Sequence, residues 1–267
     1  MVPAFLSSAP AQTPDEVVEK HLAALGGRAA LAKLTSRRST GTVTIATPNG
    51  NLAGPIEIAL KSPNKTRAFI TLDLTPLGGA DKVTIEQKFD GTAGRATNSM
   101  QGAVEITGNQ LQNMRNNTFP TPLLTYKEAG TKLEVQPKEQ VGGRDAIVLL
   151  ITPKTGPPVR YFLDAETYLV VKAVVKSSSP DMGDFDQISE PSDYRAVDGV
   201  TVPFVVKTTN PAQNLTIKLD KVEHNVALDD AIFAVKAPEA DLTAFAGAAQ
   251  ATSVGFAGVG LTACGSS

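Results

Sequence analysis

The sequence predicts a mainly β protein of the α+β class, with one broad antiparallel sheet that curls into a barrel or half-barrel. Apolar and polar residues alternate in about twelve short runs, a spacing typical of β sandwiches and barrels. Asn-Gly and Asp-Gly pairs fall between these runs, where hairpin turns are expected. No alternation of strands with helices appears, so a doubly wound nucleotide-binding sheet is disfavoured.

Residues 1–12 are interpreted as the remnant of a secretory signal. A short apolar stub precedes Ala9, Pro10 and Ala11, and an Ala-x-Ala triplet before a polar residue is typical of a secretory cleavage site. The basic start and most of the apolar core of such a signal are missing, so a cytosolic leader is the alternative. We expect an exported protein.

A helix is predicted to begin after Thr13. Residues 13–16 (Thr-Pro-Asp-Glu) form a capping box, with proline at the first helical position and glutamate three residues after the cap. Apolar residues then recur at helical spacing and make one stripe, which the glycine pair at residues 26–27 ends. A second short helical piece is predicted for residues 28–34.

From residue 41 onward the hydrophobic period becomes that of a strand. A helix-compatible piece at residues 109–117 interrupts the strands. The clearest strands lie between Val159 and Lys207, where an Asp-centred turn at residues 164–167, a polar insert and the Asp198-Gly199 turn separate apolar runs. The other apolar alternations are Val43/Ile45, Ile56/Ile58/Leu60, Ile70/Leu72/Leu74, Val83/Ile85 and Leu133/Val135.

Residues 239–267 are predicted to be an Ala/Gly-rich flexible tail. The part from residue 243 carries no charge, and so small a set of apolar groups cannot offset the entropy of ordering it. The tail holds the one cysteine, Cys264, which excludes an internal disulfide and a thiolate metal cluster. Cys264 follows lipobox-like letters, but a lipobox works at the end of an N-terminal signal, so chance explains them better.

Charge and hydropathy exclude two classes of function. Lys and Arg total 25 against 27 for Asp and Glu, a net charge of −2, so no basic field exists to hold nucleic acid. No stretch of about 20 strongly apolar residues is present, so a helical membrane span is not expected.

No motif predicts catalysis, a metal or a cofactor. The two histidines, His21 and His224, belong to no metal-ligand pattern; we expect a half-buried helix residue and a surface strand end. No G-x-S-x-G elbow is present, and the glycine pairs at residues 26–27 and 142–143 fit a helix stop and a hairpin turn better than a phosphate loop. Acidic residues such as Asp184 are scattered in predicted loops. A non-enzymatic protein is therefore expected.

Several motifs resemble the outer-membrane lipoprotein-sorting proteins, the LolA/LolB-like family. They are A-A-L-G-G-R-A-A-L-A-K-L, F-D-G-T-A-G-R-A-T-N from Phe89, Y-F-L-D-A-E-T-Y-L-V-V-K, S-D-Y-R-A-V-D-G-V-T-V-P-F and V-E-H-N-V-A-L-D-D-A-I-F. The resemblance covers residues 13–238 and implies one domain, an unclosed half-barrel with helices over its concave face. In family carriers a buried arginine helps to hold the lid closed. Arg37, Arg38 and Arg67 are near in sequence, but no motif fixes the correspondence.

The resemblance implies a periplasmic, non-enzymatic carrier or receptor that binds a lipid or lipoprotein acyl chain in an apolar groove. The alternative is an envelope interaction or sensor module that uses the same half-barrel to bind a protein partner. We expect a monomer. The aromatic residues in the strands are equally compatible with ordinary packing in the protein core and with contact to a ligand. The residues expected to line the groove are Leu22, Leu25, Ile70, Leu72, Ile85, Phe89, Phe162 and Phe204.

Overall fold

The structure, a computed structural model, describes residues 12–47, 50–75, 79, 82–179, 183–211 and 213–235. The predicted leader up to residue 11 and the predicted tail with Cys264 lie outside the described residues. Within these ranges no helix is both long and apolar enough to cross a bilayer.

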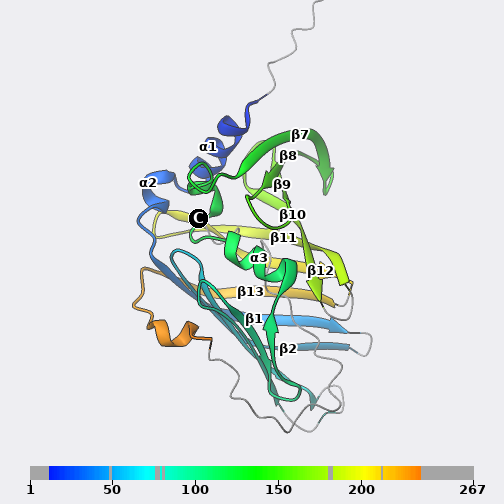
Figure 1. Ribbon diagram of the computed structural model, residues 1–267. Helices are drawn as coiled ribbons and strands as arrows, with labels where there is room; N and C mark the ends of the chain where they lie inside the picture. The colour runs from blue at the N-terminus through cyan, green and yellow to red at the C-terminus, as the bar shows by residue number, and fades with distance from the viewer. Residues whose placement is uncertain are drawn as a thin grey trace, which may run out of the picture.

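One antiparallel sheet of 13 strands forms the body of the described chain (Figure 1). The strands are β1 (Ser36–Thr47), β2 (Gly50–Lys61), β3 (Lys65–Asp73), β4 (Lys82–Phe89), β5 (Gly94–Asn98), β6 (Gly102–Ile106), β7 (Lys132–Val141), β8 (Arg144–Thr152), β9 (Val159–Asp164), β10 (Val170–Ser179), β11 (Gly183–Val197), β12 (Val200–Asn210) and β13 (Gln213–His224).

The strand order is β6-β5-β4-β3-β2-β1-β13-β12-β11-β10-β9-β8-β7. β1 and β13 pair at the centre, and along each arm the strands that neighbour each other in the sheet also follow each other in the sequence. β6 and β7 stand at opposite ends of this order, and the sheet does not close between them. The predicted mainly β, unclosed half-barrel is confirmed.

The chain passes from one edge of the sheet to the other through a segment that we call the strap, residues 107–131. It contains α3 (Gly108–Asn116) and the short 3-10 turn η2 (Pro122–Leu124). Leu111 and Met114 of α3 pack with Phe89 of β4, whereas the Asn113 amide donates to the Lys176 carbonyl of β10 at 2.8 Å. α3 therefore bridges the two arms across the concave face (Figure 1).

The predicted N-terminal helix is α1 (Pro14–Ala24), which we call the lid helix. Its capping box is confirmed: the Thr13 amide donates to the Glu16 carboxylate at 2.9 Å, and the Glu16 amide donates to the Thr13 hydroxyl at 3.3 Å. Gly26 ends the lid helix with φ +114°, and a Cβ there would lie 2.5 Å from the Gly199 carbonyl, so glycine is required. α2 (Arg28–Leu31) follows.

The main core fills the space between the lid helix and the concave face of the sheet. Val17, Val18 and Leu22 of the lid helix are fully buried in it. Strands of both arms contribute, from Ile70 of β3 to Leu149 of β8. The lid helix is thus held mainly by apolar burial, which is not directional.

Two predicted turns are confirmed. Asp198 and Gly199 both have positive φ, +52° and +82°, and join β11 to β12 as a tight hairpin. Asp164 anchors the other turn, because its carboxylate accepts from the amides of Glu166 and Thr167 at 3.1 and 2.9 Å.

The predicted polar insert between the last strands is itself strand. β11 and the end of β10 occupy it, and they pair from Ala173 with Ser189 to Ser179 with Gly183. The positions that β11 buries include Gln187 and Ser189, each 1% exposed. A strand that buries polar side chains shows no apolar alternation, which explains the difference.

Candidate functional site

Six of the eight residues predicted to line a groove meet in the main core. Ile70 of β3 and Ile85 of β4 are direct cross-strand partners. All six are at most 8% exposed: Leu22, Leu25, Ile70, Leu72, Ile85 and Phe204. The structure therefore brings the lid helix and both arms of the sheet together on one apolar surface.

The other two predicted residues lie in separate clusters. Phe89 packs with Ile106 and Met114 beneath α3. Phe162 packs with Ala146 and Val148, and the cations of Arg160 and Lys172 lie 5.1 and 4.9 Å from its ring centre. Both neighbours of Phe162, Tyr161 and Leu163, belong to the main core, so Phe162 projects from the opposite face of β9.

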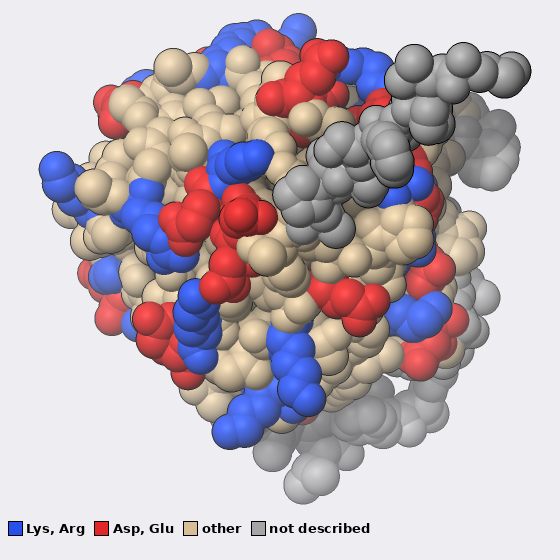
Figure 2. All heavy atoms as spheres, turned by 90° about the horizontal axis from the view of Figure 1, so that it is seen from above, with Lys and Arg blue, Asp and Glu red and all other residues tan. Residues whose placement is uncertain are grey.

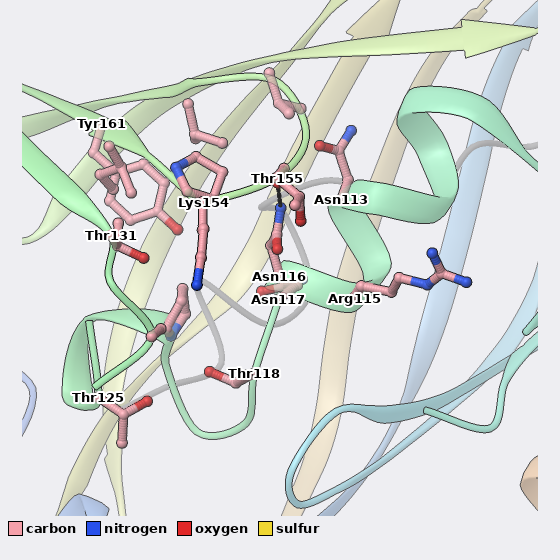
Figure 3. A pocket seen from close by; sticks show the side chains of 16 residues that line it. Asn113, Arg115, Asn116, Asn117, Thr118, Thr125, Thr131, Lys154, Thr155 and Tyr161 are labelled. Atoms are coloured by element: carbon pink, nitrogen blue, oxygen red, sulfur yellow. Dashed lines mark hydrogen bonds between the residues drawn. The ribbon is translucent and has the colours of Figure 1, made fainter. Parts of the chain in front are cut away.

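A cavity of about 240 Å³ opens at the end of the concave face that lies under the strap (Figure 3). Three segments far apart in sequence frame it: the strap from Asn113 to Thr131, the β8–β9 connection from Pro153 to Thr155, and strands β8 to β10. None of the eight predicted residues lines this cavity. Sequence reasoning missed it because its rim has the composition of an ordinary polar loop and its floor comes from separate strands.

The floor of the cavity is apolar. Ile151, Val159, Tyr161 and Val175 form it from three adjacent strands. Ile151, Tyr161 and Val175 are also members of the main core. The cavity is thus an accessible extension of the core surface, with a polar rim of Thr, Asn and Lys side chains above it.

Two contacts hold the rim of the cavity in place. The Asn116 amide of α3 donates to the Thr155 carbonyl at 2.7 Å, a bond drawn in Figure 3. Gly156 comes so close to α3 that a Cβ on it would lie 2.8 Å from Cβ of Gln112. One hydrogen bond and one close approach therefore hold the β8–β9 connection against α3.

The strap also fastens the lid helix. The Tyr126 hydroxyl and the Lys127 ammonium both donate to the Asp15 carboxylate, the latter at 2.6 Å. Arg28 donates to the Leu124 carbonyl at 2.8 Å. The bonds to Tyr126 and Lys127 lower the pKa of Asp15, the Lys127 contact more strongly. The bonds of Lys127 and Arg28 sit at the surface, where water can replace them, whereas that of Tyr126 is partly buried.

His21 lies inside the main core. It is 1% exposed, and its Nδ1 donates to the Tyr168 carbonyl at 2.8 Å, while Nε2 has no hydrogen-bond partner among the described residues. Burial lowers the pKa of His21 to about 4, so the ring is neutral at pH 7. The predicted half-buried position is corrected to full burial, because the β9–β10 turn lies against the ring at Tyr168.

His224 was expected at the surface, and that expectation is wrong. Its side chain is 1% exposed, and Nδ1 lies 3.1 Å from the Asp198 carboxylate in the β11–β12 turn. Burial and the charge of Arg37 lower the pKa of His224. Arg37 is the direct cross-strand neighbour of His224 and is itself 2% exposed.

Of the three arginines considered from sequence, Arg37 alone is buried. Arg38 and Arg67 instead lie in a surface row of ion pairs across β1 to β4, in which both pair with Glu57, at 3.3 and 3.0 Å. Arg67 also pairs with Glu86 at 2.7 Å. Alternation along β1 then places Arg37 on the concave side, with Val43.

Chemistry-bearing side chains do not gather in the described part of the chain. No group of three or more His, Cys, Asp or Glu residues there could hold a metal ion. Figure 2 shows acidic and basic side chains intermixed on the face seen from above, without a field of one sign. What the site offers is apolar surface with a polar rim.

Comparison with known proteins identifies the fold. No family model and no curated protein sequence matches the chain. Solved structures do match. A DUF1329 family protein from Desulfovibrio piger has a TM-score of 0.53 at 14% identity, covering 84% of this chain and 98% of that one. A LolA superfamily protein from Nitrosomonas europaea has a TM-score of 0.52 at 12% identity, covering 84% and 99%.

A third structure, a putative outer membrane lipoprotein-sorting protein domain from Vibrio parahaemolyticus, has a TM-score of 0.50 at 10% identity and covers 82% of this chain and 94% of that one. Identities this low establish the fold and nothing beyond it. The chain therefore has the fold of these solved structures, which include a LolA superfamily protein and a lipoprotein-sorting protein domain.

Proposed function

We propose that this protein is a periplasmic, non-enzymatic carrier or receptor for the acyl chain of a lipid or lipoprotein. The observation that carries the proposal is the cavity under the strap, whose apolar floor continues into the core surface beneath the lid helix. The fold, shared with proteins named for lipoprotein sorting, and the Ala-x-Ala triplet at residues 9–11 support the periplasmic location.

The energetics suit an acyl ligand. Each buried CH₂ contributes about 0.8 kcal/mol, so about ten methylenes reach about 8 kcal/mol, a micromolar Kd before the cost of ordering the chain. Because the cavity of about 240 Å³ is smaller than ligand pockets of ~300–1,000 Å³, a longer chain has to displace the strap or the lid helix. It would then reach the predicted lining: Leu22, Leu25, Ile70, Leu72, Ile85, Phe89 and Phe204.

A titration with a fluorescent fatty acid tests the proposal. Val159→Phe adds bulk to the floor of the cavity, whereas the control Val104→Phe makes the same change on β6, where the side chain is 39% exposed. We expect saturable uptake by the unmodified protein, at least about tenfold weaker uptake by Val159→Phe, since a filled cavity excludes the chain, and no change in the control.

Two results would count against the proposal. If the unmodified protein takes up no fatty acid or lipopeptide, and native mass spectrometry of protein from its own envelope shows no added lipid mass, an acyl carrier is excluded. If a protein partner co-purifies in place of lipid, the interaction module becomes the better reading. Equal uptake by Val159→Phe would move the binding site out of this cavity.

A further inference from the structure

The rim of the cavity carries positive charge without matching negative charge. Its lining includes Arg115 and Lys154 but no aspartate or glutamate. Arg115 is already engaged, because its Nε and Nη2 both donate to the Thr92 carbonyl at 3.3 and 3.0 Å, and its side chain points away from the cavity in Figure 3. Because Arg115 points away, the cationic group at the opening is that of Lys154.

Lys154, an exposed residue, is placed to use that charge at the opening of the cavity. Its side chain reaches across the opening in Figure 3, and its stem lies 4.0 Å from the position that a Cβ on Gly130 would take. Within the described ranges it has no ion pair and no hydrogen bond. A cation of this kind keeps its full capacity to bind an anion.

Hydrogen-bond donors surround the same opening. The hydroxyls of Thr118, Thr125 and Thr131 and the amide of Asn117 belong to the lining. None of these four side chains makes a hydrogen bond to another residue in the described part of the molecule. A carboxylate or phosphate held by Lys154 could therefore also accept from hydroxyl or amide groups, which strengthens a charged contact.

We propose that the cavity selects an anionic amphiphile, with the acidic head group at Lys154 and the acyl chain on the floor formed by Ile151, Val159, Tyr161 and Val175. This inference rests on the proposed function and narrows its ligand from acyl chains in general to those with a carboxylate or phosphate head. The polar rim and the apolar floor then recognise the two ends of one molecule.

The test compares an acid with its neutral ester. The probes are cis-parinaric acid and its methyl ester, which share one fluorescent chain and differ in head-group charge. The variants are Lys154→Gln and Lys154→Arg, with Lys207→Gln as control, because Lys207 is an exposed lysine of β12 outside the cavity. Lysophosphatidic acid, added as a competitor against cis-parinaric acid, shows whether a phosphate head is accepted as well as a carboxylate head, and the uncharged monoacylglycerol is its control.

We expect Lys154→Gln to weaken binding of the acid about tenfold and to leave binding of the ester unchanged, as loss of one charge-assisted contact requires. Lys154→Arg should keep most of the affinity, and Lys207→Gln all of it. Added salt should weaken the binding of the acid and leave the binding of the ester unchanged.

Equal affinity of the unmodified protein for acid and ester, with no effect of Lys154→Gln, would overturn the anionic head group and leave the acyl carrier standing. Failure of both probes to bind would overturn the carrier itself. A loss of both probes in Lys154→Gln with an unchanged melting temperature would show that Lys154 shapes the cavity instead of reading charge.

Discussion

Buried basic side chains set the electrostatics of this core at the scale of single residues. His21 and His224 both have their pKa lowered, in each case chiefly by burial. A histidine whose folded pKa lies below its unfolded value binds its proton less readily in the folded state. Its contribution to stability is complete above the unfolded pKa and is lost as the pH falls toward the folded one.

His21 therefore makes the fold acid-sensitive between about pH 6.5 and about pH 4. In this window the unfolded chain protonates His21 and the folded protein does not, which removes about 3 kcal/mol of stability in total. We expect His21→Leu to flatten that part of the profile, while at pH 7 it stays within about 2 kcal/mol of the unmodified protein because the Tyr168 carbonyl loses a donor. Urea unfolding at a series of pH values measures this.

His224→Leu serves as the comparison for that experiment. This variant retains His21, so it should still lose the part of its stability at acid pH that depends on His21. If the free energy of unfolding depends on pH in the same way for His21→Leu and the unmodified protein, the His21 ring is exposed to water and not buried. Below about pH 4 the carboxylates dominate in every variant, since ion pairs such as that of Asp15 are lost there.

At the scale of elements, α3 is held by close fit as much as by apolar burial. Its buried residues include Gln110 and Asn113, both polar. Gly156 of the β8–β9 connection meets α3 with φ +91° and with no room for a side chain near Gln112. The close approach of Gly156 therefore adds to the bonds from Asn113 and Asn116 in fixing the position of α3 over the cavity.

Gly156→Ala should unseat α3. The positive φ costs about 1–2 kcal/mol for any L-residue, and the clash with Gln112 adds about 1–3 kcal/mol. The matched control is Gly143→Ala in the β7–β8 turn, where φ is +79° and a Cβ would meet nothing within 4 Å. Urea denaturation should show a larger loss for Gly156→Ala. If both variants lose the same unfolding free energy, α3 shifts to accommodate the new methyl group without cost.

Elements governed by neighbouring residues could be predicted from the sequence. The capping box before α1 and the Asp198-Gly199 hairpin each depend on residues within one turn. The first part of β11 could not be predicted, because it buries Gln187 and Ser189 and so lacks an apolar period. The burial of His224 escaped for a related reason: the turn that covers it is 26 residues away.

The candidate site was less accessible to sequence reasoning than the fold. Apolar positions such as Ile70 and Leu72 were expected on the concave face because alternation assigns a strand residue to one side. Phe162 lies in a run that is buried on both faces, where alternation cannot choose a side. The cavity joins Thr131, Lys154 and Val175 from separate segments, and only the folded sheet brings them together.

For the whole molecule, the open sheet should produce a gradient of local stability. β1 and β13 have partners on both sides, whereas β6 has a partner on one side and four of its five residues are exposed. We expect amides of β6 to exchange with deuterium about 100-fold faster or more than those of Val43 and Ile217, since edges open without global unfolding. Hydrogen exchange followed by mass spectrometry measures it. Uniform protection would indicate a covered edge.

The strap has a mechanical consequence. It is the covalent tether between the two rims of the half-barrel, since β6 enters it and β7 leaves it. If the sheet flattens, the rims separate and the tether is drawn taut over the concave face; if the sheet curls more tightly, the tether slackens. The curvature of the sheet and the space between the strap and the floor residues Ile151 and Tyr161 therefore change together. A protease cut within the strap would remove this coupling.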